Sequence, residues 1–129
     1  MKRMLLVVVF LTTTLFSSMN WVGELEDAYD KAEKENKIIM VMLSQKGCPA
    51  CKYMKESVLR NESVIKVFNK NFIAVHLDIH EDYVPLALEH VVTPTFYFLN
   101  ADEKILGVIH GSKNEKDLLD ELEKVKATL

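Results

Sequence analysis

Apolar residues along this chain follow two spacings, recurring every three to four residues in some segments and running consecutively or in alternation in others. From Trp21 to Asn36 the first spacing holds, with acids and lysines between the apolar positions, which predicts an amphipathic helix. Ile38 to Leu43 is a nearly unbroken apolar run, short enough for a strand buried on both faces. The first helix is therefore expected to lead into a central strand.

Three more strands are predicted downstream. In Phe72 to Ile79 one side of the extended chain carries Phe72, Ala74 and His76, and the aliphatic residues occupy the other side. Thr95 to Leu99 is rich in aromatic and β-favouring residues, and Ile105 to His110 follows it after a short polar turn. The last two strands are expected to form a hairpin.

Four further helical segments complete the pattern. One begins at the Cys48-Pro49-Ala50-Cys51 motif, and a shorter one covers Val64 to Phe68. A third is predicted over Val84 to His90, started around Pro85. The last is expected to start at a capping box formed by Ser112 and Glu115 and to carry an apolar stripe toward its end.

This order of elements predicts an α/β fold. A helical crossover between the first two strands makes them parallel, and the hairpin makes the last two antiparallel. The expected architecture is a mixed sheet of four strands, or five, with helices on both faces. With 129 residues and ordinary globular composition, one domain over residues 19–129 accounts for the chain after its first segment.

The first segment has the layout of a signal peptide. Lys2 and Arg3 precede an uncharged run from Met4 to Phe16, and two serines follow. The run is well short of the roughly 20 residues that span a bilayer as a helix, which favours removal of residues 1–18 and export to the periplasm. An uncleaved membrane anchor remains the alternative, because bulky residues stand where small ones usually precede the cut.

Charge excludes one class of partner. The formal net charge of -3 gives no electrostatic footprint for nucleic acid, so no binding to DNA or RNA is expected.

The two cysteines carry the candidate chemistry. A Cys-x-x-Cys that opens a helix places its first sulfur beside unpaired backbone N–H groups and the positive end of the helix dipole, which stabilise a thiolate. Cys48 is therefore predicted to be the nucleophile. Cys51 lies one turn on, from where it can attack a mixed disulfide as the resolving thiol. Lys46 and Lys52 either favour the anionic form of Cys48 or are ordinary surface lysines.

Other uses of the pair are weaker. Covalent haem attachment needs a histidine directly after the second cysteine, where Lys52 stands. Copper or zinc binding needs further ligands, for which His76, Asp78 and His80 are the candidates. A purely structural disulfide would close too short a loop to add much stability.

Cys48-Pro49-Ala50-Cys51 after a buried strand, Thr93-Pro94-Thr95 before another, and Gly111 before a final helix resemble thioredoxin from about Trp21 to Val125. The Lys46–Lys52 segment and the strand from Phe72 are more narrowly similar to exported thioredoxin-like proteins of bacterial sulfur oxidation and cytochrome maturation. The resemblance implies that Pro94 is a cis-proline facing the cysteines and that the Thr93 backbone pairs with an extended substrate. It further implies substrate contacts at Gly47, Pro49, Ala50 and Gly111.

This chain departs from thioredoxin at two positions near the cysteines. Gly47 stands where thioredoxins usually carry Trp, and Met42 stands where they bury an aspartate on the central strand. The usual proton acceptor for the resolving cysteine is thus missing. His76 aligns with a lysine that lies near that acid in thioredoxins. We therefore hypothesise that His76 helps to deprotonate Cys51, against the alternative that it is a packing residue.

The expected function is that of a periplasmic thiol–disulfide oxidoreductase, acting as a reductase of protein disulfides. Such an enzyme needs substrate proteins with disulfides and a membrane thiol electron donor, and no cofactor or metal. The reductase is favoured because the stretch between the second strand and Pro94 is too short for the helical insertion or dimerisation domain that dedicated oxidases and isomerases usually add. A monomer is expected. The alternatives are a thiol oxidase and a copper- or haem-pathway thiol chaperone. The remaining aromatic residues, Trp21 among them, are expected to pack in the core or on the sheet.

Overall fold

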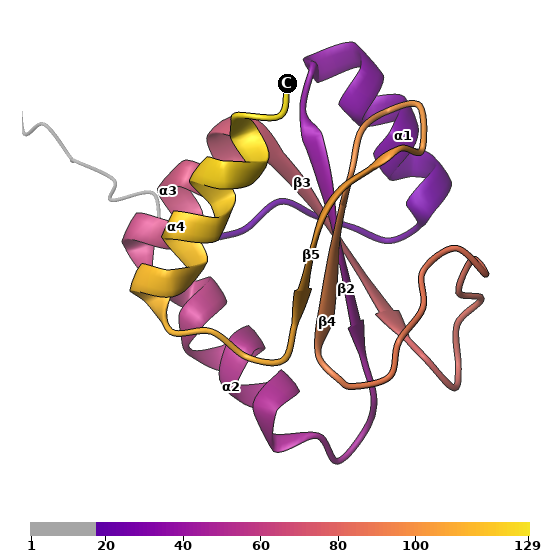
Figure 1. Ribbon diagram of the computed structural model, residues 1–129, viewed down its shortest axis with the longest axis vertical. Helices are drawn as coiled ribbons and strands as arrows, with labels where there is room; N and C mark the ends of the chain where they lie inside the picture. Colours follow the sequence, from indigo (N-terminus) through magenta and orange to yellow (C-terminus); the bar gives the residue numbers. More distant parts are fainter. Residues whose placement is uncertain (1–17) are drawn as a thin grey trace, which may run out of the picture.

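The computed structural model describes residues 18–129 (Figure 1). Five strands form one mixed sheet in the order β1-β3-β2-β4-β5. They are β1 (Trp21–Val22), β2 (Ile38–Ser44), β3 (Phe72–Asp78), β4 (Thr95–Leu99) and β5 (Ile105–His110). Strand β2 pairs in parallel with β3 and antiparallel with β4, which in turn pairs antiparallel with β5. The predicted mixed sheet is confirmed, with five strands.

Helices cover both faces of this sheet. Helix α1 (Leu25–Glu35) lies on one face, and α2 (Pro49–Glu56), α3 (Glu62–Asn71) and α4 (Glu115–Lys126) lie on the other (Figure 1). A 3-10 turn, η1 (Val58–Arg60), joins α2 to α3. The crossover through α2 and α3 allows β2 and β3 to run parallel, as the order of elements predicts.

Two apolar cores lie on opposite faces of β2, all seven residues of which are buried. Met40 and Met42 point to the core under α2, α3 and α4, together with Phe96 and Phe98 of β4. The alternate residues of β2 join the core under α1. Burial of each large side chain contributes about 1.5–3 kcal/mol, so the three central strands carry much of the hydrophobic stabilisation of the fold.

The prediction of a helix from Trp21 is wrong at its start. Trp21 and Val22 form the short edge strand β1, paired in parallel with Ala74 and Val75, and the helix begins at Leu25. Gly23, a poor helix residue, separates the two elements. Of the two places expected for Trp21, the core or the sheet, it takes the second, since 40% of its surface is exposed and its ring meets that of His76 from β3.

The predicted helix over Val84 to His90 is absent. The segment makes a single turn, in which the Leu88 N–H donates to the Pro85 carbonyl at 2.9 Å. Leu88 alone is buried there, whereas Leu86 is 95% exposed. A few residues with one apolar anchor cannot offset the cost of nucleating a helix.

The capping residue of α4 also differs from the prediction. Asn114, and not Ser112, is the N-cap, and its side chain accepts a hydrogen bond from the Asp117 N–H at 2.8 Å. Asn114 and Asp117 have the same spacing as Ser112 and Glu115, and asparagine is an equally good N-cap. The helix therefore starts two residues later in the chain than the capping box implied.

The predicted signal segment lies outside the described residues, apart from Ser18. Within residues 18–129 no helix is long and apolar enough to cross a membrane.

Candidate active site

The cysteine motif follows the carboxyl end of the central strand. After Ser44, the last residue of β2, the chain turns through Gly47, which has a φ of 72°. Cys48 is then the N-cap of α2, and Pro49 occupies the first turn of the helix, where its missing N–H costs nothing. The predicted start of a helix at the cysteines is confirmed.

Cys48 and Cys51 form a disulfide and differ in their access to solvent. Their Cα atoms are 5.3 Å apart. Cys48 is partly exposed, whereas Cys51 is only 5% exposed and belongs to the core under α2. The Cys51 N–H donates to Cys48 Sγ at 3.1 Å. Since the nucleophile must reach the sulfur of a substrate disulfide, this arrangement favours Cys48 for that role.

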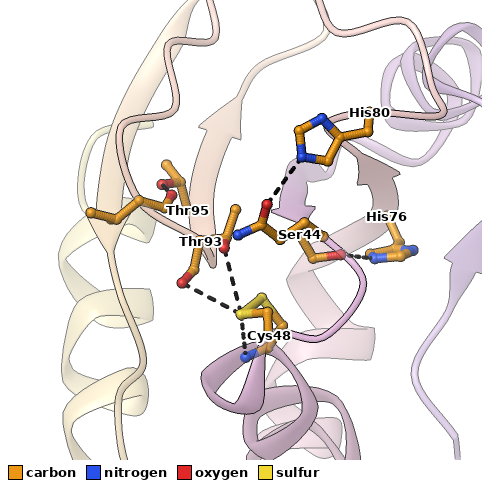
Figure 2. The surroundings of a disulfide bond; sticks show 9 residues. Ser44, Cys48, His76, His80, Thr93 and Thr95 are labelled. Atoms are coloured by element: carbon orange, nitrogen blue, oxygen red, sulfur yellow. Dashed lines mark hydrogen bonds between the residues drawn. A yellow bond between two sulfur atoms is a disulfide. The ribbon is translucent and has the colours of Figure 1, made fainter.

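Thr93 and Pro94 face the cysteines from the start of β4. The Thr93–Pro94 peptide bond is cis, the conformation that the thioredoxin resemblance implied. The Thr93 hydroxyl donates to Cys48 Sγ at 3.5 Å, and the Thr93 carbonyl oxygen lies 3.6 Å from the same sulfur (Figure 2). Two segments far apart in sequence thus meet at one sulfur atom.

The other residues that are predicted to contact substrate differ in exposure and in their hydrogen bonds. Pro49 is exposed and Ala50 half-buried on the first turn of α2. Gly111 has a φ of 81°, and its N–H donates to the Pro94 carbonyl at 2.8 Å. The Gly111 N–H therefore fixes the cis-proline segment, and its hydrogen bond is already made inside the protein.

A cleft of about 1180 Å³ adjoins the disulfide, and both cysteines line it. Its wall includes Trp21 and His76, whose rings meet edge to face with centroids 6.4 Å apart. The Lys55 ammonium lies 5.9 Å from the centroid of the Trp21 ring. The cleft gives solvent a route to the side of the site on which Cys51 is buried.

His76 stands beside the position where thioredoxins bury their acid. Its register partner across the β2–β3 pair is Met42, which is fully buried. The Ser44 hydroxyl is hydrogen-bonded to His76 Nε2 (Figure 2). Burial lowers the pKa of His76 below its ordinary value, and the Lys55 charge lowers it further, against the smaller opposing effects of Asp82 and Asp78. His76 is therefore neutral at pH 7 and able to accept a proton.

Sequence reasoning missed Ser44 and Trp21 as residues near the site. The signal for Ser44 was present, because strand alternation places it on the same face as Met42, two residues before. No sequence signal marked Trp21, which reaches the cleft only because β1 pairs with the edge of β3.

The candidate metal ligands are separated. β3 ends at Asp78, so the alternation of His76, Asp78 and His80 on one face does not continue to His80. The His80 ring is hydrogen-bonded to Gln45 at 3.1 Å, and Asp78 accepts the backbone N–H groups of His80 and Glu81. Between Ser18 and Leu129, no three His, Cys, Asp or Glu side chains gather in a way that could hold a metal ion.

The two lysines near Cys48 are surface residues. Lys46 forms an ion pair with Glu81, whose hydrogen bond and charge raise the pKa of the lysine. Its ammonium is thus directed to the acid, and Lys52 is also exposed.

Comparison with known proteins identifies the family. A family model described as "Thioredoxin-like" matches residues 20–101. The chain belongs to the thioredoxin-like family. A thioredoxin from Thermus thermophilus is 24% identical, with a TM-score of 0.69 over 84% of this chain and 88% of that one. A DsbH oxidoreductase is 15% identical, with a TM-score of 0.68 over 91% and 92% of the two chains. The chain thus combines the thioredoxin-like fold with a Cys-x-x-Cys pair, Cys48 and Cys51.

A curated relative of this thioredoxin-like chain is a much longer protein. Spermatogenesis-associated protein 20 from Mus musculus is 33% identical over 72 residues, which are 56% of this chain. They are only 9% of that protein, so the match concerns a small part of it.

The turn before Cys48 generates a stability prediction. Replacement Gly47→Ala should lower the free energy of unfolding by about 1 kcal/mol, because a φ of 72° is strained for a residue with a Cβ. No atom lies within 4 Å of the added Cβ, so steric overlap adds nothing. The matched control is Gly23→Ala, which has the same free space without a positive φ and should leave stability unchanged or slightly higher. Urea denaturation of both variants measures this, and equal losses would contradict it.

Proposed function

We propose that this protein is a periplasmic reductase of protein disulfides that receives its electrons from a membrane thiol donor. The observation that carries its thiol–disulfide chemistry is the environment of Cys48 Sγ. This sulfur is partly exposed, receives hydrogen bonds from the Cys51 N–H and the Thr93 hydroxyl, and lies beside the Thr93 carbonyl. After reduction, the same two donors favour a thiolate at Cys48.

The chemistry follows from the two positions of the pair. The Cys48 thiolate attacks one sulfur of a substrate disulfide, a mixed disulfide forms, and the other substrate sulfur leaves as a thiolate. Cys51 then loses its proton and attacks Cys48 Sγ. The Cys48–Cys51 disulfide forms, and the second substrate thiol is released. Two electrons pass to the substrate, and the protein must be reduced again by another dithiol.

The reductive direction is supported by the connection between β3 and β4. Residues 79–94 form this connection and contain neither helix nor strand. Dedicated oxidases and isomerases of this fold usually add a helical insertion or a dimerisation domain. We therefore retain the monomeric reductase as the leading proposal and the thiol oxidase as its alternative.

Export rests on the sequence of residues 1–18, with its basic start and uncharged apolar run. Because the periplasm is oxidising, a reductase there needs an electron source across the membrane, which is why a membrane thiol donor is part of the proposal. The narrower similarity to proteins of sulfur oxidation and cytochrome maturation is consistent with such a pathway.

The direction of electron flow is tested by the equilibrium reduction potential of the Cys48–Cys51 pair, measured against glutathione. A reductase is expected near roughly -270 mV, where thioredoxin lies. A value near about -120 mV would make the pair an electron acceptor and would replace the reductase by the oxidase. Replacement Cys51→Ser serves as the control, because it removes the two-electron couple and leaves Cys48.

Export is tested by expressing the full chain in a bacterium, releasing the periplasm by osmotic shock and sequencing the N-terminus of the protein. We expect release into the periplasmic fraction and a new N-terminus close to Ser17 or Ser18. An intact Lys2-Arg3 start in the membrane fraction would instead indicate the uncleaved anchor, and an intact chain in the cytoplasm would refute export.

A further inference from the structure

The second half of the reaction needs a base that the core around Cys51 does not offer. Cys51 is 5% exposed and lies in a cluster with Met42, Met54 and Ala74. Burial in apolar surroundings disfavours the thiolate, which is the form that attacks a mixed disulfide. A proton acceptor must therefore reach Cys51 from the edge of this cluster.

The side chains on the α2 face of β2 and β3 show where that acceptor lies. Alternation places Ser44 on the same face as Met42, and His76 on the same face as Ala74. Met42 is in direct register with His76. Ser44 and His76 are hydrogen-bonded to each other, and both line the cleft that Cys51 also lines. The polar pair thus borders the apolar cluster on the side where solvent enters.

We propose that the Ser44–His76 pair accepts the proton of Cys51 during resolution of the mixed disulfide, with Ser44 relaying it to His76 Nε2. This inference rests on the proposed reaction of Cys48 and Cys51 and adds a residue, Ser44, to it. Met42 has no group that could accept a proton, and the Ser44–His76 pair supplies one.

The Cys51 thiol gives its proton to Ser44 Oγ, directly or through a solvent molecule in the cleft, and the Ser44 hydroxyl proton moves to His76 Nε2. The Cys51 thiolate attacks Cys48 Sγ, and the bond between Cys48 and the substrate sulfur breaks. The leaving thiolate then takes a proton from solvent, to which the His76 imidazolium returns its own.

The charges around His76 suit this role. Lys55 from α2 disfavours the imidazolium, whereas Asp78 at the end of β3 and Asp82 in the following loop favour it. The Trp21 ring from β1 meets the His76 ring edge to face, and the Ser44 hydroxyl from β2 is hydrogen-bonded to His76 Nε2. With burial added, the pKa of His76 lies below its usual range, so the base is unprotonated through neutral pH.

The two steps can be resolved in one stopped-flow experiment on the reduced full chain. Mixing it with an aromatic disulfide such as 5,5′-dithiobis(2-nitrobenzoate) releases one coloured thiolate when Cys48 attacks and a second when Cys51 resolves the mixed disulfide. We expect His76→Gln to leave the first phase unchanged and to slow the second by about 100-fold or more at neutral pH, starting from the lower end of the range for general acid–base catalysis.

The pH profile separates a proton acceptor from a packing residue. In the wild-type chain the second phase should be level through neutral pH and fall only at acid pH, as His76, whose pKa is lowered by burial, becomes protonated. In His76→Gln it should rise about tenfold per pH unit from about pH 6 to pH 8, because deprotonation then depends on hydroxide. Ser44→Ala should also slow the second phase, and Ser44→Thr, which keeps the hydroxyl, should restore most of it.

His80→Gln is the matched control, since the exposed His80 ring is bonded to Gln45 and lies outside the pair. Equal slowing by His80→Gln and His76→Gln, or an unchanged pH profile in His76→Gln, would overturn the proposal. A normal second phase in Ser44→Ala would overturn the relay through the hydroxyl. A first phase no faster than that of a thiol in an unfolded chain would instead refute the proposed function. A first phase as fast in each variant as in the wild type shows that the folded surroundings of Cys48 are kept.

Discussion

The antiparallel pairing of β2 with β4 determines where the two halves of the site meet. Its register places Leu43 opposite Thr95, so the turn that leaves β2 toward Cys48 and the segment that enters β4 from Thr93 lie at the same edge of the sheet. A slip of one residue would turn Phe96 and Phe98 away from their core. The apolar side chains that fix this register therefore also fix the contact between Thr93 and Cys48.

The same sheet explains why the two cysteines behave differently. Cys48 stands at the N-cap of α2, above the edge of the sheet, where hydrogen-bond donors and solvent reach its sulfur. Cys51 lies one turn further along, where it is buried in the apolar cluster to which Met42 of β2 also belongs. One sulfur is thus prepared for attack on a substrate, and the other is protected until the mixed disulfide forms. Release of the substrate then depends on how the protected thiol loses its proton.

Much of the fold was predictable because its periodic signals are strong. The apolar run of β2, the β4–β5 hairpin and the amphipathic α4 each bury a face that their residue pattern defines. The start of α1 was predicted wrongly because tertiary contacts pair Trp21 with β3. The segment after Pro85 was predicted wrongly because tertiary contacts bury only Leu88 there, which is too little to stabilise a helix.

The site residues also fall into two groups, those that the sequence marks and those that only tertiary contacts bring to the site. Cys48 and Cys51 are marked by their spacing and by the strand before them, and the role of the Thr93–Pro94 segment came from the thioredoxin resemblance. The Ser44–His76 hydrogen bond depends on the register of two strands 32 residues apart in the chain, which no local pattern encodes. Trp21 likewise enters the cleft only through the edge pairing of β1.

The central claim, that Cys48 is the attacking thiol and Cys51 the resolving one, is tested most directly by trapping. The reduced Cys51→Ser chain is mixed with a protein substrate that contains a disulfide, and the product is digested and analysed by mass spectrometry without reductant. The account predicts a stable mixed disulfide at Cys48, and no such adduct at Cys51 when Cys48→Ser is treated in the same way. An adduct that accumulates at Cys51 instead would contradict it.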